Sequence, residues 1–152
     1  MSKKTKNSKK RDYAVFIVSH KRPDKIYTLS ILEKCWYTGD TYIVIDDEDD
    51  TVEQYKEIHW DSLIVFDKKK ASECTDTYDN QKKLRGLVYA RNAMFDIAKE
   101  RGYDYFLVLD DDYTEFSIRY NSEDQFGYWR VNDLDRLFEL FLSILGIQMH
   151  SA

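Results

Sequence analysis

The sequence predicts an α/β fold in which helices cover both faces of a mainly parallel sheet. Short apolar runs alternate along the chain with segments of helical periodicity, and that order implies right-handed crossovers between parallel strands. The short runs are apolar throughout, as expected of strands that are buried on both faces. The chain has 152 residues, of which 43% are hydrophobic, so it is long enough for one domain with its own core.

Each predicted element has its own signal. Apolar runs rich in β-branched residues predict strands at 13–19, 42–45, 63–66 and 105–109. Helices are expected at 25–36, 51–57, 81–101 and 133–145. Asp24 is placed to cap the first helix, and Gly102 is placed to end the third. The third helix has an apolar stripe that includes Val88, Met94 and Phe95. Together these elements predict a Rossmann-like sheet flanked by helices.

Charge is distributed unevenly along the chain. The net charge is −5, yet the first eleven residues, MSKKTKNSKKR, contain only basic charges. We expect residues 1–12 to form a disordered basic tail, either merely solubilising or able to attract nucleic acid, and residues 13–152 to form one domain. Cys35 and Cys74 suggest neither a disulfide framework nor a thiolate metal site. Without a secretory signal or an apolar run of about 18 residues, a cytoplasmic protein is expected.

Three of the four predicted strands end in polar side chains of a kind that suggests a binding site. Ligands of parallel sheets bind beyond the carboxyl ends of the strands, so these positions are the candidate site. They are Ser19 and Arg22 after the first strand, Asp46 and Asp47 after the second, and Asp110, Asp111 and Asp112 after the fourth.

The triple aspartate suggests a divalent metal site. Three adjacent carboxylates repel one another unless a positive charge neutralises them. Alternate side chains share one side of a chain that leaves a strand, so Asp110 and Asp112 are expected to converge while Asp111 points away. Two hard oxygen ligands with open positions suit Mg²⁺ or Mn²⁺. The alternative is a solvated acidic turn.

Arg91 falls on the apolar stripe of the third predicted helix, between Val88 and Phe95. A guanidinium group keeps its charge, so on that face it needs an anionic or hydrogen-bonded partner. The candidates are an ion pair with the aspartates at the strand ends and a contact with a bound diphosphate, and the sequence does not choose between them.

Three segments resemble the GT-A glycosyltransferases, especially the family-2-like group. These segments are VFIVSHKRPDKI, YIVIDDEDDT and RGLVYARNAMFDIAKERGYDYFLVLDDD, which together span about residues 13–112. They are similar to that family's opening strand with its Ser-x-x-Arg-Pro turn, its strand ending in Asp-Asp, and its Ala-Arg-Asn helix leading to a DxD motif. The opening segment and DDDYTEF also resemble the phage-type TET-associated glycosyltransferases, which decorate hydroxymethylated DNA bases.

The resemblance implies a role for each candidate residue. Asp46 and Asp47 would contact the base and ribose of a nucleotide-diphospho-sugar, most simply a UDP-sugar. Arg22 and Arg91 would line the diphosphate site, where Ser19 and Asp111 are also expected. Asp112 would ligate Mn²⁺ or Mg²⁺ directly, with Asp110 beside the ribose or a metal-bound water. The sugar would pass to an acceptor hydroxyl, with a hydroxymethylated DNA base as one candidate. A phage enzyme would act in the host cytoplasm.

The resemblance does not identify the residues that bind the acceptor. Members of the family usually carry an acceptor-binding half after the DxD motif, whereas only residues 113–152 follow it here, so we expect this half to be incomplete. We therefore assign no catalytic base. LVLDDDYT also resembles the motif of haloacid-dehalogenase-type phosphatases, with Asp110 as nucleophile and Asp112 as general acid, although that motif normally follows a first strand. A non-catalytic nucleotide-binding module is the other alternative.

Overall fold

A four-stranded parallel sheet forms the centre of the molecule. The structure is a computed structural model that describes residues 11–73, 87–122 and 125–144. The strands are β1 (Tyr13–Val18), β2 (Asp40–Asp46), β3 (Leu63–Phe66) and β4 (Tyr105–Asp110), in the order β3-β2-β1-β4. Every pairing is parallel, which confirms the predicted fold class.

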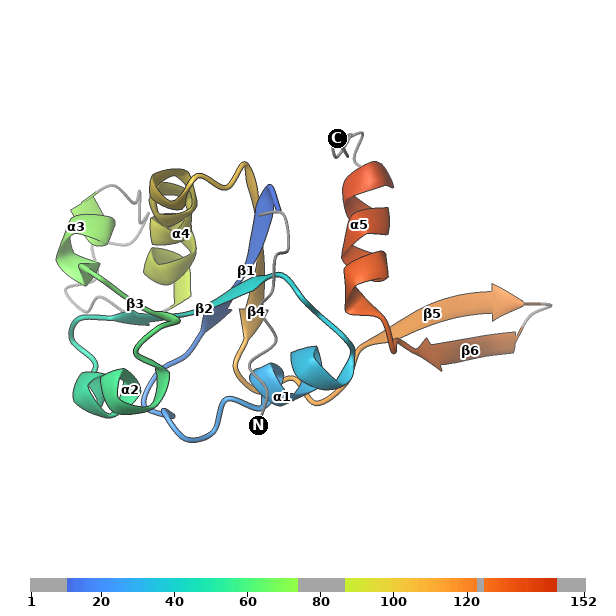
Figure 1. Cartoon of the computed structure of the whole chain (residues 1–152), viewed down its shortest axis with the longest axis horizontal. Helices are drawn as coiled ribbons and strands as arrows, with labels where there is room; N and C mark the ends of the chain where they lie inside the picture. The colour runs from blue at the N-terminus through green and yellow to red at the C-terminus, as the bar shows by residue number, and fades with distance from the viewer. Residues whose placement is uncertain (1–10, 74–86, 123–124, 145–152) are drawn as a thin grey trace, which may run out of the picture.

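Helices cover both faces of this sheet. Alternate residues of β1 point to opposite faces. Val15 and Ile17 belong to a core that also contains residues of α1 (Tyr27–Lys34), α2 (Val52–His59) and α5 (Leu134–Ile144). Ala14 and Phe16 belong to a second core, against α4 (Leu87–Arg101). In Figure 1, α4 and α2 lie on opposite sides of β2 and β3. The apolar run of β1 is therefore buried on both sides, as the sequence predicted, whereas Val65 of β3 and Tyr105 of β4 are partly exposed.

The first helix starts differently from the prediction. α1 begins at Tyr27, and no side chain caps it, so the expected capping role of Asp24 is wrong. The helix is anchored through Thr28, whose backbone N–H donates to the carbonyl of Asp111 at 3.3 Å and whose hydroxyl donates to the carbonyl of Asp110 at 2.5 Å. This hydrogen bonding attaches α1 directly to the end of β4.

The end of α4 confirms the predicted role of Gly102. This glycine has φ 73°, a left-handed conformation that costs a residue with a Cβ about 1 kcal/mol or more. Its N–H donates to the carbonyl of Lys99, and the N–H of Tyr103 donates to that of Ala98. These two bonds are the Schellman arrangement that ends many helices.

The apolar stripe predicted for this helix is partly wrong. Val88 and Phe95 are 53% and 67% exposed, whereas the buried face comprises Tyr89, Ala90, Met94, Ile97 and Ala98. Ala90 and Ala98 belong to the core beneath the helix, whereas Val88 and Phe95 lie outside it. The predicted helical residues 81–86 lie outside the described residues.

One helix and two strands were not predicted. α3 (Lys68–Glu73) has no buried residue and therefore no apolar stripe. β5 (Ser117–Ser122) and β6 (Gln125–Arg130) form an antiparallel two-stranded sheet that is separate from the main one. Figure 1 shows this hairpin extending away from the body of the molecule.

The last two residues of the predicted tail belong to the fold. Arg11 makes a paired hydrogen bond to the carboxylate of Asp135 on α5, at 2.7 and 2.8 Å. The carbonyl of Asp12 accepts the backbone N–H groups of Asp104 and Tyr105. The prediction for residues 1–10 lies outside the described residues. Across the described segments, no helix combines the length and apolarity needed to cross a membrane.

Candidate functional site

The carboxyl ends of the strands bring the predicted residues to one edge of the sheet. Val18, the last residue of β1, is in register with Val44 of β2 on one side and with Asp110 of β4 on the other. Asp46 ends β2 opposite Phe66 of β3. The loops that carry the other candidate site residues therefore begin at adjacent strand ends.

The middle carboxylate of the triple aspartate is buried and fully engaged. Asp111 is 7% exposed and accepts a hydrogen bond of 2.7 Å from the hydroxyl of Ser19. The Ser19 oxygen also lies 2.6 Å from the hydroxyl of the fully buried Tyr55, which must be the donor because Ser19 gives its own proton to Asp111. Burial raises the pKa of Tyr55, so its hydroxyl keeps the proton that it donates. No pattern in the sequence indicated a role for Tyr55, which comes from α2.

Arg22 completes this network from the loop after β1. Its guanidinium group donates to Asp111 at 3.2 Å, and its backbone N–H donates to the Tyr55 hydroxyl at 3.0 Å. The Arg22 side chain remains 55% exposed. It can therefore contact a ligand at this edge while Asp111 holds it in place.

Arg91 approaches the tip of β4 from α4. Its guanidinium lies 3.9 Å from the carboxylate of Asp110, with 55% of the arginine and 41% of the aspartate side chain exposed. The sequence analysis offered an aspartate or a bound diphosphate as the partner of Arg91, and in the structure its neighbour is Asp110. An exposed pair at this distance is weak, so a stronger anion could displace it.

Asp110 and Asp112 are the carboxylates that remain accessible. Asp110 is partly exposed and Asp112 is exposed. Within the described ranges, no three His, Cys, Asp or Glu side chains are grouped closely enough to hold a metal by themselves. Two hard oxygen donors suit Mg²⁺ or Mn²⁺ if water and phosphate oxygens supply the other ligands. A metal at this pair remains a prediction.

The loop after β1 is fixed by contacts that the sequence did not suggest. Lys21 has φ 56°, an uncommon conformation for a residue with a side chain, and its N–H donates to Asp49 at 2.8 Å. The Asp49 side chain is fully buried and also lies 3.1 Å from the ring of His20. The ring of His59 lies 2.7 Å from the carbonyl of Pro23. These contacts hold Ser19 and Arg22 in position.

Asp49 makes the stability of this loop dependent on pH. Burial raises the pKa of Asp49, but hydrogen bonds from Thr51 and from the N–H of Lys21 outweigh burial and hold it below its ordinary value. A carboxylate with a lowered folded pKa stabilises the protein above its unfolded pKa of about 4, and this contribution is lost as the pH falls through the folded pKa. We expect Asp49→Asn to flatten the acid side of a curve of urea midpoints measured between about pH 3 and 6.

Asp50→Asn is the control for this measurement, because the Asp50 side chain is 68% exposed. Equal acid slopes for the unmodified protein and Asp49→Asn would contradict the assignment.

Asp46 and Asp47 lie beside a lysine that the sequence analysis missed. Asp47 is exposed and accepts the backbone N–H of Lys68 at 3.0 Å, at the start of α3. The Lys68 ammonium lies 3.5 Å from Asp46 and 3.2 Å from Glu48. The available signal was position, because Lys68 follows the third strand, whose carboxyl end was not considered. Contacts of Asp46 and Asp47 with a base or ribose remain predictions.

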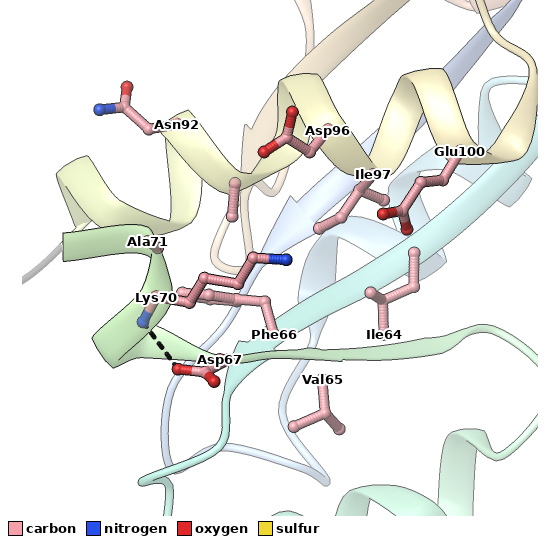
Figure 2. A pocket seen from close by; sticks show the side chains of 11 residues that line it. Ile64, Val65, Phe66, Asp67, Lys70, Ala71, Asn92, Asp96, Ile97 and Glu100 are labelled. Atoms are coloured by element: carbon pink, nitrogen blue, oxygen red, sulfur yellow. Dashed lines mark hydrogen bonds between the residues drawn. The ribbon is translucent and has the colours of Figure 1, made fainter. Parts of the chain in front are cut away.

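Two cavities lie away from the predicted residues. The first, shown in Figure 2, has a volume of about 230 Å³ and lies along β3 between α3 and α4. Asp67, Asp96 and Glu100 line it with Lys70, whose N–H donates to Asp67 at 2.8 Å. That volume is below the usual range of ligand pockets. The second, about 710 Å³, lies beside β4 and α5 and is mainly apolar. None of the predicted site residues therefore lines either of these two cavities.

Comparison with known proteins identifies a family. The family model described as TET-Associated Glycosyltransferase matches residues 13–146. No curated protein and no solved structure matches the chain.

Proposed function

Since this chain belongs to the TET-associated glycosyltransferase family and is a glycosyltransferase, we propose that it takes its sugar from a nucleoside diphosphate with the help of Mg²⁺ or Mn²⁺. The proposed donor is a UDP-sugar, and the proposed acceptor is the hydroxyl of a hydroxymethylated base in DNA. The proposed location is the cytoplasm, that of the host if the gene belongs to a phage.

The observation that carries this proposal is that the three aspartates differ in burial. Asp111 is buried and neutralised by Arg22, whereas Asp110 and Asp112 are left accessible at the same tip. Asp110 and Asp112 are two positions apart on the chain, and a divalent cation bound by both would neutralise their charge. Arg22 and Arg91 each contact one aspartate of this tip, so two guanidinium groups are available to a diphosphate that joins the cation.

The residues have distinct tasks in this proposal. Asp112 ligates the cation, Asp110 lies beside the ribose or a metal-bound water, and Asp46 and Asp47 contact the base and ribose. The cation supplies positive charge at the diphosphate leaving group. In the transfer, the acceptor oxygen forms a bond to C1 of the sugar and releases its proton to water, and the bond from C1 to the diphosphate oxygen breaks so that the nucleoside diphosphate leaves. Arg22 and Arg91 hold the phosphate oxygens and so fix the direction of departure.

Calorimetry with UDP tests the proposal. We expect UDP to bind in the presence of Mn²⁺ or Mg²⁺ and to lose measurable affinity when EDTA removes the metal, because the carboxylates alone would repel the diphosphate. Binding that is unaffected by EDTA, or no binding at all, would count against it. A slow metal-dependent hydrolysis of UDP-sugar separates a transferase from a non-catalytic nucleotide-binding module.

The strand order and the family membership both argue against the phosphatase alternative. It assigned Asp110 as a nucleophile in a motif that normally follows a first strand, whereas β4 follows three strands of the sheet. Membership of a glycosyltransferase family explains the same aspartates.

A further inference from the structure

We propose that Lys68 is a positioning residue of the donor site, which holds Asp46 and Asp47 in place to contact the base and ribose of the donor nucleotide. This inference deepens the function proposed above and rests on it. It gives a task to a lysine that follows β3, the one strand whose end carried no predicted site residue.

The end of the sheet brings Lys68 to the two aspartates. Asp46 is in register with Phe66, and the backbone N–H of Asp47 donates to the carbonyl of Phe66 at 3.0 Å. The pairing of β2 with β3 therefore continues to Asp47. Lys68 follows Phe66 by two residues and begins α3. It thus reaches both aspartates from the strand that lies next to theirs.

Lys68 contacts the two aspartates through different groups. Its backbone N–H donates to the carboxylate of Asp47 at 3.0 Å. Its ammonium group lies 3.5 Å from the carboxylate of Asp46 and 3.2 Å from that of Glu48. Asp47 is exposed, and an ionised carboxylate accepts several hydrogen bonds, so it can still accept donors from a ligand. One residue therefore fixes the direction of both carboxylates.

The Lys68 side chain is more enclosed than a lysine usually is. It is 13% exposed, whereas the following Lys69 and Lys70 are exposed. Enclosing a lysine costs side-chain entropy and hydration, so the contacts with the carboxylates must offset that cost. Burial lowers the pKa of Lys68, but the contacts with Glu48 and Asp46 outweigh burial and raise it above its ordinary value. The ammonium group therefore stays charged.

The charges around Asp46 indicate what this ammonium group does. Asp46, Asp47 and Glu48 are adjacent, and like charges repel one another. Lys68 lies against one carboxylate oxygen of Asp46, and the ring of His20 lies 3.7 Å from the other. Without the ammonium group, Asp46 and Glu48 would repel each other, and the direction of Asp46 would no longer be fixed. Recognition of base and ribose needs acceptors in fixed directions, so Lys68 serves the nucleoside part of the donor.

Calorimetry with Mn²⁺ and two ligands, UDP and pyrophosphate, tests the inference. Lys68→Met removes the ammonium group and keeps an aliphatic stem of similar length. We expect UDP to bind about tenfold more weakly to this variant, as when a hydrogen bond to a charged group is lost. Pyrophosphate has neither base nor ribose, so its affinity should change by less than about twofold. Lys69→Met is the matched control, because it removes the same charge from the next, exposed residue.

A double-mutant cycle with Asp46→Asn is the second measurement. If Lys68 acts through Asp46, then Lys68→Met should weaken UDP binding by less than about twofold once Asp46 is replaced, because the two changes remove one interaction. Additive losses in the double variant would contradict the inference. The cycle decides if pyrophosphate binds too weakly to measure, and the comparison of ligands decides if Asp46→Asn alone abolishes UDP binding.

Urea unfolding of the same preparations separates positioning from a structural role. Weaker UDP binding with unchanged pyrophosphate binding and an unchanged urea midpoint supports the inference. Two results would overturn it: an unchanged UDP affinity in Lys68→Met, or an equal loss for UDP and pyrophosphate, which would assign Lys68 to the phosphates or to the fold. If the unmodified protein does not bind UDP with metal, the proposed function fails first, and this inference fails with it.

Discussion

Asp112→Ala is expected to abolish metal-dependent binding of UDP and to leave the stability of the protein unchanged. Asp112 is exposed, and no partner of its side chain is found among residues 11–73, 87–122 and 125–144. Its removal should therefore change the free energy of unfolding by less than about 0.5 kcal/mol. Loss of a direct metal ligand should weaken metal-dependent binding by more than about 100-fold, since loss of an outer partner alone costs 10 to 100-fold.

Calorimetry with UDP and Mn²⁺, together with urea unfolding, measures both expectations. Asp61→Ala is the control, because Asp61 is an exposed carboxylate in the turn between α2 and β3. Wild-type affinity in Asp112→Ala would show that the cation, if one is bound, depends on other groups. Loss of affinity together with loss of stability would show that Asp112 has a structural role instead.

Asp111→Ala is expected to have the opposite profile, with a large loss of stability. The change removes the acceptor of the Ser19 hydroxyl and the counter-ion of Arg22, and it leaves the Ser19 hydroxyl in a buried site without its acceptor. Removing one member of a buried hydrogen-bonded network of this kind should cost about 2–3 kcal/mol. UDP binding should also weaken, because Arg22 loses the contact that fixes its position.

Urea unfolding of Asp111→Ala and Asp111→Asn measures this effect. The amide oxygen of asparagine can still accept the Ser19 hydrogen bond, so the asparagine variant should lose less stability than the alanine variant. If Asp111→Ala unfolds at the same urea concentration as the unmodified protein, the network does not stabilise the fold, and Arg22 is held by its other contacts.

The central sheet could be predicted because its strands are short apolar runs, of which β1 is buried on both faces. The apolar runs of β1, β3 and β4 contain few polar residues, so their position depended on no detail of packing. The exposed face of α4 could not be predicted in the same way. Val88 and Phe95 are apolar, and only the close approach of Ala90 to the sheet shows that another face is buried. The hairpin was missed because the described apolar side chains of its strands, Ile118 and Trp129, are exposed and do not give the pattern of a strand packed on a core.

The residues of the candidate site could be predicted, but the contacts between their side chains could not. The rule that ligands bind at the carboxyl ends of strands located Ser19, Arg22 and the aspartates. It could not show that Tyr55 reaches Ser19 from α2, or that Lys68 lies against Asp46. Such contacts depend on how the helices pack, and a sequence taken alone has no distance information across them.

The burial of Asp111 between two accessible neighbours means that the three aspartates are not copies of one another. Shortening the run by one residue would keep two acidic side chains but would bring Tyr113 forward into the third place. The chain would then retain a carboxylate for the Ser19 and Arg22 contacts only by giving up the outermost one. Counting acidic residues at this strand end therefore says little about a related chain. The role of an acidic residue here depends on whether it is the first, second or third residue after Leu109, the last buried residue of β4.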